Sequence, residues 1–183
     1  KSWDMNKNLW KNTGRKLMYF DGSGTCTILY DQASNILYRY ISSSKSYKRV
    51  SNVIDKLNGN RYYFYDANGN RRTSSGWKKV NGSTAYYVCD DGYVTSRYTD
   101  QKGTKKVYDF DYSKNTWVQK KNMWKTVYRS RYYFGSKGVA TISYNNSTKK
   151  AYKFTGRKWK PAKKLIMKIG NANYYFNSAA KRV

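Results

Sequence analysis

The segment Gly76–Val88 reads GWKKVNGSTAYYV and contains a complete β-hairpin signature. An apolar stretch around Trp77 leads into Asn81-Gly82, a dipeptide that two-residue hairpin turns favour because both central residues adopt positive φ. A second stretch follows and ends in Tyr87-Val88. The segment Asn58–Gly69 repeats the pattern and adds a Gly-containing turn after its aromatic stretch. These two blocks predict an all-β protein built from β-hairpins.

The block recurs along the whole chain. Each of five copies ends in a pair of large residues, at Tyr19-Phe20, Tyr63-Phe64, Tyr87-Val88, Tyr133-Phe134 and Tyr175-Phe176. A large apolar residue stands nine or ten positions earlier in each copy, namely Trp10, Ile54, Trp77, Trp124 and Ile166. Self-similarity of this kind is typical of repeat architectures, in which each unit buries its apolar face against its neighbours.

Three of the five copies carry a second half, in which Thr-x-x-Tyr is followed by Tyr-x-aromatic and a final aromatic residue. The units therefore run long, short, long, long, short. We expect tandem β-hairpin repeats, either as one solenoid-like array or as two small β lobes. Residues 1–75 would form an N-terminal lobe of one long and one short unit. Residues 76–183 would form a strongly basic C-terminal lobe of two long units and one short unit. Segments 51–57 and 162–169 have spacings that also suit helical turns, but their alignment with the other copies favours strands.

The composition argues against catalysis. The chain has 183 residues, with 37 Lys and Arg against 10 acidic residues, a net charge of +27. All acidic residues are Asp, and neither Glu nor His occurs, which excludes a His general base and the Ser-His and Cys-His arrangements. The close pairs Asp90-Asp91 and Asp109/Asp111 are expected to serve turns and solvation. We expect no enzyme activity, no cofactor and no metal. Cys26 and Cys89 lie at non-equivalent repeat positions, which favours free thiols over a single bridge.

The blocks at 76–88 and 58–69 resemble the cell-wall-binding repeat of Gram-positive surface proteins, a family that includes choline-binding and glucan-binding repeats. The resemblance implies a chain of β-hairpins that anchors surface proteins to wall polymers. A net charge of +27 is a poor match for the cation choline, and the Met that often lines choline cages is missing from the expected positions. The basicity is similar instead to the wall-attachment regions of Lactobacillus surface-layer (S-layer) proteins. That similarity implies binding to anionic wall glycopolymers such as teichoic or lipoteichoic acid.

Positive charge gathers in the C-terminal part of the chain. Residues 1–75 hold 13 Lys and Arg against 5 Asp, whereas residues 76–183 hold 24 against 5. After Asp111 there are 18 Lys and Arg and no acidic residue. A one-signed segment repels itself, and a polyanion would relieve that repulsion with release of counterions; a solvated face is the plain alternative. The candidate polyanion-binding residues are Lys120, Lys121, Lys125, Arg129, Arg131, Lys149, Lys150, Lys153, Arg157, Lys158, Lys160, Lys163 and Lys164.

Sugar units of such a polymer would stack on exposed aromatic faces. The candidates for stacking are Trp117, Trp124, Tyr128 and Trp159. Recurring aromatic residues belong more often to the core of each hairpin layer. The aromatic residues outside the repeat pattern, Tyr65, Tyr93, Tyr112 and Tyr128, are therefore the better candidates for exposed contacts.

Two other functions stay open at this point. One is a choline- or glucan-binding targeting module of an exported hydrolase, and the other is nonspecific nucleic-acid binding. For the leading interpretation we expect an extracellular, wall-associated location. The longest apolar run is Ala85–Cys89, so no membrane span is expected. Because the chain opens at Lys1 without a signal peptide, we expect a mature or excised piece of a longer protein.

Overall fold

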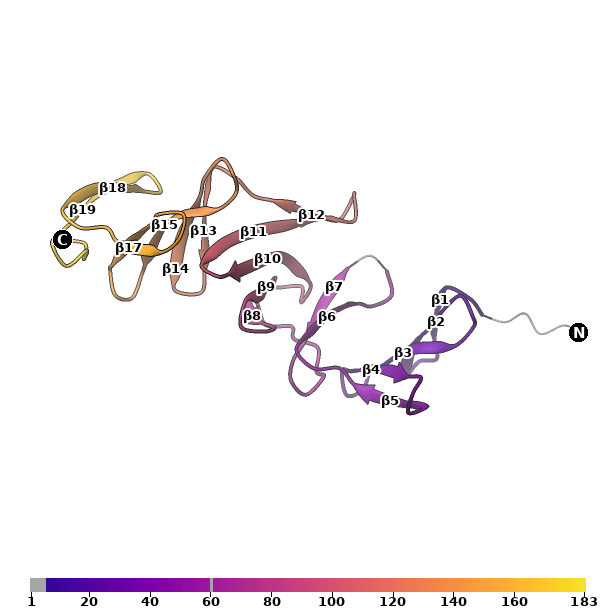
Figure 1. The fold of residues 1–183 in the computed structure, drawn as a ribbon. Helices are drawn as coiled ribbons and strands as arrows, with labels where there is room; N and C mark the ends of the chain where they lie inside the picture. Colours follow the sequence, from indigo (N-terminus) through magenta and orange to yellow (C-terminus); the bar gives the residue numbers. More distant parts are fainter. Residues whose placement is uncertain (1–5, 60) are drawn as a thin grey trace, which may run out of the picture. The chain divides into compact units, whose positions relative to one another are not determined.

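The computed structural model describes residues 6–59 and 61–183, and all of their regular secondary structure is β. The strands form three antiparallel sheets of five strands and two sheets of two strands (Figure 1). This confirms the predicted all-β fold class and places strands at both segments whose spacing also suited a helix. None of the described residues forms a helix long and apolar enough to cross a membrane.

Each five-stranded sheet is a meander in which consecutive strands are neighbours. The first contains β1 (Leu9–Asn12), β2 (Lys16–Phe20), β3 (Cys26–Asp31), β4 (Ile36–Ile41) and β5 (Ser46–Arg49), and the hairpin β6 (Val53–Lys56) and β7 (Tyr62–Tyr65) follows it. The second contains β8 (Gly76–Lys79), β9 (Thr84–Val88), β10 (Val94–Gln101), β11 (Thr104–Asp111) and β12 (Thr116–Gln119). The third contains β13 (Met123–Val127), β14 (Ser130–Phe134), β15 (Ala140–Asn145), β16 (Ala151–Phe154) and β17 (Trp159–Pro161), and the hairpin β18 (Leu165–Ile169) and β19 (Ala172–Phe176) follows it. Sheets of five, two, five, five and two strands match the long and short units of the sequence.

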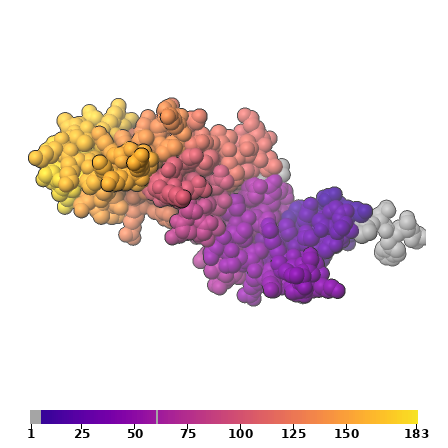
Figure 2. Space-filling view, viewed as in Figure 1, coloured from indigo at the N-terminus to yellow at the C-terminus, as the bar shows by residue number. Residues whose placement is uncertain are grey.

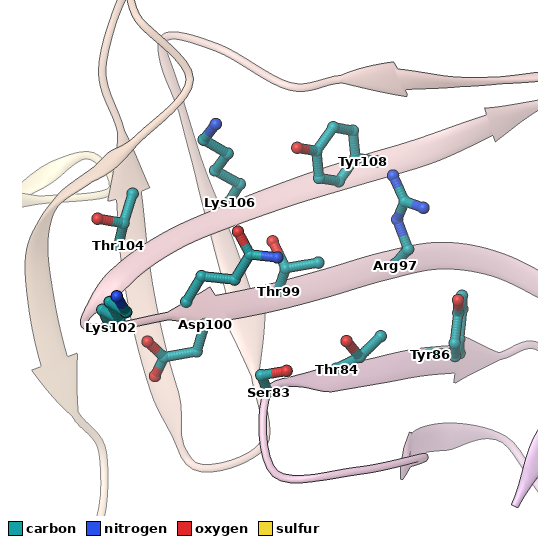
Figure 3. Close-up of a pocket in the computed structure, with 11 residues that line it drawn as sticks. Ser83, Thr84, Tyr86, Arg97, Thr99, Asp100, Lys102, Thr104, Lys106 and Tyr108 are labelled. Carbon is teal, nitrogen blue, oxygen red and sulfur yellow. The ribbon is translucent and has the colours of Figure 1, made fainter.

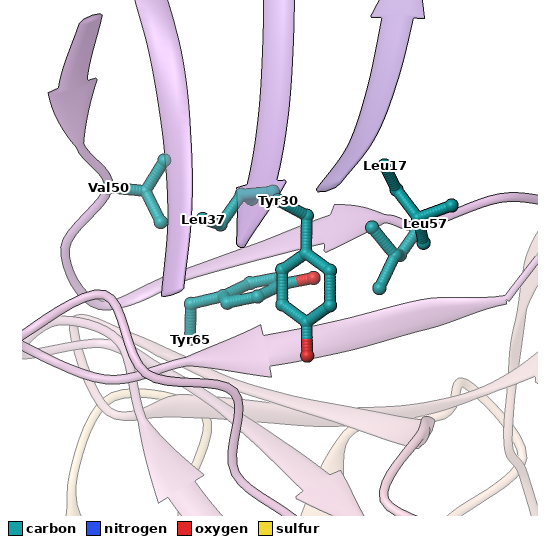
Figure 4. Packing of buried hydrophobic residues seen from close by; sticks show 6 residues of the cluster. All are labelled: Leu17, Tyr30, Leu37, Val50, Leu57 and Tyr65. Carbon is teal, nitrogen blue, oxygen red and sulfur yellow. The ribbon is translucent and has the colours of Figure 1, made fainter. Parts of the chain in front are cut away.

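The chain forms two compact units. Unit 1 runs to Val80 and takes in Tyr87–Val94, and unit 2 consists of Asn81–Tyr86 and Thr95–Val183. In each unit a core lies between a five-stranded sheet and the hairpin that follows it. The core of unit 1 contains Leu17, Tyr30, Leu37, Val50, Leu57 and Tyr65 (Figure 4). The core of unit 2 contains Tyr144, Ala151, Ala162, Met167, Ile169 and Phe176.

The same turn follows the second strand of every repeat. The N–H of its fourth residue donates to the carbonyl of its first at 2.8–3.0 Å, in the pairs Gly24–Asp21, Gly69–Asp66, Gly92–Cys89, Gly138–Gly135 and Ala180–Asn177. The fourth residue has φ between +58° and +83° in all five copies. Glycine adopts this conformation without steric cost, and it occupies four of the five positions.

These turns correct the alignment of the second repeat by one residue. The turn begins directly after Tyr65, as the last one begins directly after Phe176. Tyr65 pairs with Val53 in the same way that Phe176 pairs with Leu165. The recurring pair is therefore Phe64-Tyr65, and Tyr65 is 0 % exposed. The prediction that Tyr65 makes exposed contacts was wrong.

Both cysteines are free thiols in the structure. Cys26 begins β3 and Cys89 follows β9, and both are partly buried.

The substitution Gly69→Ala tests the turn. A Cβ at Gly69, where φ is +76°, would lie 3.1 Å from the carbonyl oxygen of Val50 and 3.3 Å from Cγ2 of Ile36. The left-handed backbone costs a non-glycine residue about 1 kcal/mol, and overpacking adds about 1–2 kcal/mol. We expect urea unfolding to show a loss of about 2–3 kcal/mol. Gly14→Ala is the control, because Gly14 has φ of +82° and open space around it; equal losses at both positions would contradict the packing argument.

The substitution Tyr65→Phe is expected to stabilise unit 1. The Tyr65 hydroxyl is buried and has no hydrogen-bond partner among the described residues, and burial raises the pKa of Tyr65 far above its usual value. An unsatisfied buried hydroxyl costs about 1 kcal/mol or more, so its removal should raise the free energy of unfolding by about that amount. Tyr30→Phe is the control, because the Tyr30 hydroxyl donates to Oδ1 of Asn35 at 2.7 Å. Chemical unfolding that shows equal destabilisation by both substitutions would refute the prediction.

Candidate functional site

A single row of side chains crosses the first five-stranded sheet from β1 to β5. In register, Trp10 lies opposite Tyr19, Tyr19 opposite Ile28, Ile28 opposite Arg39, and Arg39 opposite Lys48. Side chains directly opposite each other on neighbouring strands share one face of the sheet. The rings of Trp10 and Tyr19 contact each other, with centroids 5.3 Å apart. The row thus has two aromatic rings at one end and two cations at the other.

The third five-stranded sheet carries the same row. It consists of Trp124, Tyr133, Ile142, Lys153 and Lys160, each opposite the next. The Trp124 and Tyr133 ring centroids are 5.5 Å apart. In the second sheet the last three positions hold Ser96, Asp109 and Val118. The fourth position of the row is therefore a cation in the first and third sheets, Arg39 and Lys153, and a carboxylate in the second sheet, Asp109.

Each of the two aromatic ends borders a cavity. The one in unit 1 has a volume of about 320 Å³ and is lined by Trp10, Tyr19, Ile28, Asp55, Lys56, Gly59 and Tyr62. The one in unit 2 has a volume of about 310 Å³ and is lined by Trp124, Tyr133, Ile142, Lys168 and Gly170. We call these the unit 1 pocket and the unit 2 pocket. Both are large enough for one sugar ring, and both offer aromatic faces on which its apolar side can stack.

Cationic groups stand beside both pockets. In unit 1, the Lys56 ammonium lies 5.2 Å from the centroid of the Tyr62 ring. In unit 2, the Arg131 guanidinium lies 5.8 Å from the Trp124 ring. The same guanidinium rests against Gly170, where a Cβ would lie 3.0 Å from its Nη2. The unit 2 pocket therefore has Lys168 and Arg131 at its edge.

In two copies, the third residue of the following hairpin contacts the charged residue of the row. In unit 1 this residue is Asp55, and Arg39 donates to its Oδ2 from Nε at 2.8 Å. Lys125 takes the equivalent place against the second sheet and donates from Nζ to Oδ1 of Asp109 at 3.2 Å. In unit 1 the row supplies the cation and the hairpin supplies the carboxylate, whereas in the second sheet the row supplies the carboxylate and the hairpin supplies the cation. In both copies the charge of the row residue is neutralised. The residue in the same place next to the third sheet is Met167.

Asp109 is held ionised by several groups. Burial acts to raise the pKa of Asp109, but the Ser96 hydroxyl and the Lys125 and Lys120 ammonium groups together lower it below its usual value. The Ser96 hydroxyl donates to Oδ1 at 2.6 Å, and Lys120 lies 3.5 Å from Oδ2. This carboxylate therefore binds two of the lysines that the sequence analysis assigned to a polyanion.

A third cavity lies on the sheet face formed by β9, β10 and β11 (Figure 3). It has a volume of about 870 Å³ and is lined by Ser83, Thr84, Tyr86, Arg97, Thr99, Asp100, Gln101, Lys102, Thr104, Lys106 and Tyr108. The Arg97 guanidinium lies 4.4 Å from the Tyr108 ring and 5.0 Å from the Trp117 ring. Its Nε is buried and has no hydrogen-bond partner among the described residues. Asp100 is the one acidic residue of the lining and is paired with Lys105.

The structure separates the predicted polyanion-binding residues into distinct groups. Lys120 and Lys125 are paired with Asp109. Arg131, Lys153 and Lys160 lie on the face of the third sheet that carries Trp124. The others are exposed and lie in the connections between strands, namely Lys121, Arg129, Lys149, Lys150, Arg157, Lys158, Lys163 and Lys164.

The predicted stacking residues also differ in their surroundings. Trp124 lines the unit 2 pocket, and Tyr128, in the turn between β13 and β14, is 51 % exposed. Trp117 packs on Phe110 with centroids 4.9 Å apart. Trp159 packs on Phe154 and donates from Nε1 to the Gly103 carbonyl at 3.1 Å. Trp117 and Trp159 thus have packing partners within the protein.

The sequence analysis missed the aromatic and cationic residues of unit 1 and the cations of the large cavity. Trp10, Tyr19 and Arg39 were available as a signal, because they occupy the same repeat positions as Trp124, Tyr133 and Lys153. Arg97 and Lys106 lie before Asp111, outside the part of the chain where charge alone is one-signed. Within the described ranges, no group of three or more Asp and Cys side chains is placed to hold a metal ion.

No family model matches this sequence, and no curated protein matches it. Among solved structures, an alternansucrase in complex with isomaltononaose is 16 % identical with a TM-score of 0.29, and the match covers 97 % of this chain and 13 % of that one. The modular autolysin LytC from Streptococcus pneumoniae is 14 % identical with a TM-score of 0.24, covering 97 % and 48 %. CbpF in complex with ipratropium is 18 % identical with a TM-score of 0.29, covering 92 % and 42 %. This chain spans less than half of each of these proteins.

The pH dependence of stability tests the role of Asp109. Because its pKa is lowered in the native state, the ionised form adds stability above the usual Asp pKa of about 3.9, and this stability is lost as the pH falls through the native pKa. Asp109→Asn should cost about 1 kcal/mol at pH 7 and reduce the decline below about pH 4. Urea unfolding at a series of pH values measures both effects. Asp91→Asn, in an exposed turn, is the control, and an unchanged acid limb in Asp109→Asn would contradict the assignment.

Proposed function

We propose that this chain is a noncatalytic carbohydrate-binding module that holds its parent protein on a cell-wall polymer or glucan. The repeated row carries this proposal. In two copies, a pair of aromatic rings borders a pocket for a sugar, and cations stand at the far end of the same row. Two weak sites on one chain raise the overall affinity for a repeating polymer without a deep pocket.

Within that class we propose an anionic wall glycopolymer, such as teichoic or lipoteichoic acid, as the ligand. Neighbouring strands are about 4.8 Å apart, so the second aromatic ring and the first cation of a row are separated by about 10 Å. A sugar stacked on the ring can therefore place a phosphate of the same polymer near the cation. Binding of this kind releases counterions and weakens as salt is added. An extracellular, wall-associated location belongs to the same proposal.

The environment of the pair Asp109/Asp111 supports a noncatalytic role. A glycosidase needs one carboxyl group whose pKa is raised, so that it can donate a proton. Hydrogen bonds from Ser113 and the Lys114 backbone lower the pKa of Asp111, and the pKa of Asp109 is lowered as well. Asp111 accepts from the Ser113 N–H at 3.0 Å and the Ser113 hydroxyl at 2.6 Å, which is a turn-forming role.

A second candidate is a choline- or glucan-binding targeting module of an exported hydrolase. The observation that favours it is the ion pair between Arg39 and Asp55, which neutralises the row cation next to the unit 1 pocket and suits an uncharged sugar. The first candidate would bind an anionic wall polymer and belong to a surface-layer protein. The second would bind choline or a glucan and belong to an exported hydrolase. Nonspecific nucleic-acid binding is the remaining alternative, and competition with DNA tests it.

Sedimentation with purified cell walls tests the proposed function. The chain should bind intact walls and lose most of its binding after teichoic acids are extracted or salt is raised. Trp10→Ala and Trp124→Ala should each weaken wall binding about tenfold, as expected for an aromatic anchor worth about 1.4 kcal/mol. Leu9→Ala is the matched control, because Leu9 is exposed and faces away from the neighbouring Trp10 on β1.

The outcomes separate the candidates. Undiminished binding to stripped walls, together with binding to isomaltononaose, would replace the anionic polymer by a glucan. Release by free choline would favour the choline-binding alternative. Release by DNA at equal phosphate concentration would favour nonspecific polyanion binding. Failure to bind walls, glucan or choline would refute the carbohydrate-binding proposal.

A further inference from the structure

We propose that the unit 2 pocket selects a sugar unit bearing an anionic group, a phosphate or a carboxylate, whereas the unit 1 pocket has no such preference. The inference rests on the proposed function, because it takes both pockets to be glycan sites. It assigns different ligand chemistry to two copies of one pocket within the same chain.

The two pockets are copies by strand register. In each unit, the charged residue of the row lies opposite the isoleucine that lines the pocket, as Arg39 opposite Ile28 and Lys153 opposite Ile142. In each following hairpin, the third residue of the first strand lies opposite a tyrosine, as Asp55 opposite Tyr63 and Met167 opposite Tyr174. Asp55 and Met167 therefore occupy equivalent positions. The unit 1 pocket has a carboxylate at this position and the unit 2 pocket has an apolar side chain.

In unit 1 the first cation of the row, Arg39, is already occupied, and Lys48 lies one strand farther from the pocket. Arg39 donates to Oδ2 of Asp55 from both Nε and Nη2. The Asp55 side chain is 11 % exposed, so this carboxylate is largely withdrawn from water. An anion approaching Arg39 would compete with Asp55 and be repelled by it. The lining of the unit 1 pocket thus holds one carboxylate, Asp55, and one ammonium group, Lys56, and this balance of charge suits an uncharged sugar.

In unit 2 the corresponding cation has no carboxylate. Met167 is 5 % exposed and places an apolar side chain where Asp55 stands in unit 1. Lys153 lies directly opposite Lys160, and both are exposed. Like charges directly opposite each other on neighbouring strands repel. Among the described residues, neither ammonium group has an ion-pair or hydrogen-bond partner.

The other cations of this pocket point to the same ligand chemistry. Lys168 lines the cavity, and Arg131 lies over Trp124. The third sheet and the final hairpin form one continuous surface, orange to yellow in Figure 2. No acidic residue follows Asp111 in the sequence, so no carboxylate belongs to either element. A sugar stacked on Tyr133, the ring next to Trp124, would lie beside Lys168 and about 10 Å from Lys153, so an anionic substituent directed along the row would approach Lys153 and relieve its repulsion with Lys160.

The test follows the indole N–H signals of Trp10 and Trp124 by two-dimensional NMR in the full chain. Each signal is assigned with a Trp→Phe variant. The probes are deacylated lipoteichoic acid for phosphate, oligogalacturonate for carboxylate and isomaltononaose for an uncharged glucan. At Trp124, at least one anionic probe should bind about tenfold more tightly than isomaltononaose, and added salt should remove this preference. At Trp10, affinities should differ by less than about twofold and be insensitive to salt.

Exchange of the charged partner gives the decisive variants. Met167→Asp places a carboxylate beside Lys153 and should abolish the preference at Trp124 while leaving Trp10 unchanged. Asp55→Asn frees Arg39 and should create an anionic preference at Trp10. Because Met167 is buried and its replacement can prevent folding, Lys153→Gln at an exposed position provides a second test and should lower anion affinity at Trp124 severalfold. Lys137→Gln, in an exposed turn of the same sheet, is the matched control and should have no effect.

Two failures are distinguishable. If Lys153→Gln and a folded Met167→Asp both leave the anion affinity at Trp124 unchanged, the selectivity inference is overturned and glycan binding stands. Equal salt-insensitive affinity for all probes at both signals would overturn it too. If no probe moves either indole signal, the proposed function itself is refuted.

Discussion

The turn after the second strand of each repeat determines which face of the sheet every side chain occupies. Together with a register shift between Tyr133 and Phe134, it sets Tyr133 opposite Ile142 and Phe134 opposite Ala140. Phe134 is then fully buried, and Tyr133 joins the row beside Trp124. The same shift occurs between Tyr19 and Phe20 in unit 1. Because side chains alternate along a strand, a turn one residue shorter would exchange the two faces, and the aromatic pocket would be lost even with every aromatic residue retained.

Seven of the ten acidic residues are committed to the scaffold. Asp21, Asp31, Asp66 and Asp111 accept backbone N–H groups within their own turns. Asp55, Asp100 and Asp109 are paired with cations. With 10 acidic residues against 37 Lys and Arg, most cations have no carboxylate to bind. The distribution of the few carboxylates therefore decides where positive charge stays available to a ligand.

Local signals were sufficient for the order of the strands but not for the site. Asn-Gly turns and alternating strands are read within a few residues, which is why the long and short units could be predicted. The run Tyr62–Tyr65 is aromatic throughout, so its phase is set only by the turn at Asp66, and the alignment slipped by one residue there. To predict the rows of side chains, one must know which residues lie opposite each other on neighbouring strands. A count of charges along the sequence does not hold that information. The count of charges assigned Lys125 and Lys153 to the same polyanion-binding group. In the structure Lys125 is paired with Asp109, whereas Lys153 has no carboxylate partner among the described residues. One signal in the sequence was not used, namely the common spacing of the two oppositely charged pairs. Arg39 and Asp55 are 16 residues apart, and so are Asp109 and Lys125.

The sign of the charges in these rows is not dictated by the fold. The same two positions hold Arg39 with Asp55, Asp109 with Lys125, and Lys153 with Met167, and all three combinations are compatible with the same strand pairing. Opposed lysines at Lys153 and Lys160 cost the folded state about a few tenths of a kcal/mol. A carboxylate in place of the buried Met167 would cost more in lost hydration than this repulsion, so the apolar side chain is the better choice for folding. The unpaired charge of Lys153 is therefore the consequence of an apolar residue at that place, and an anionic ligand that reaches Lys153 from the solvent side would supply the negative charge that the scaffold does not.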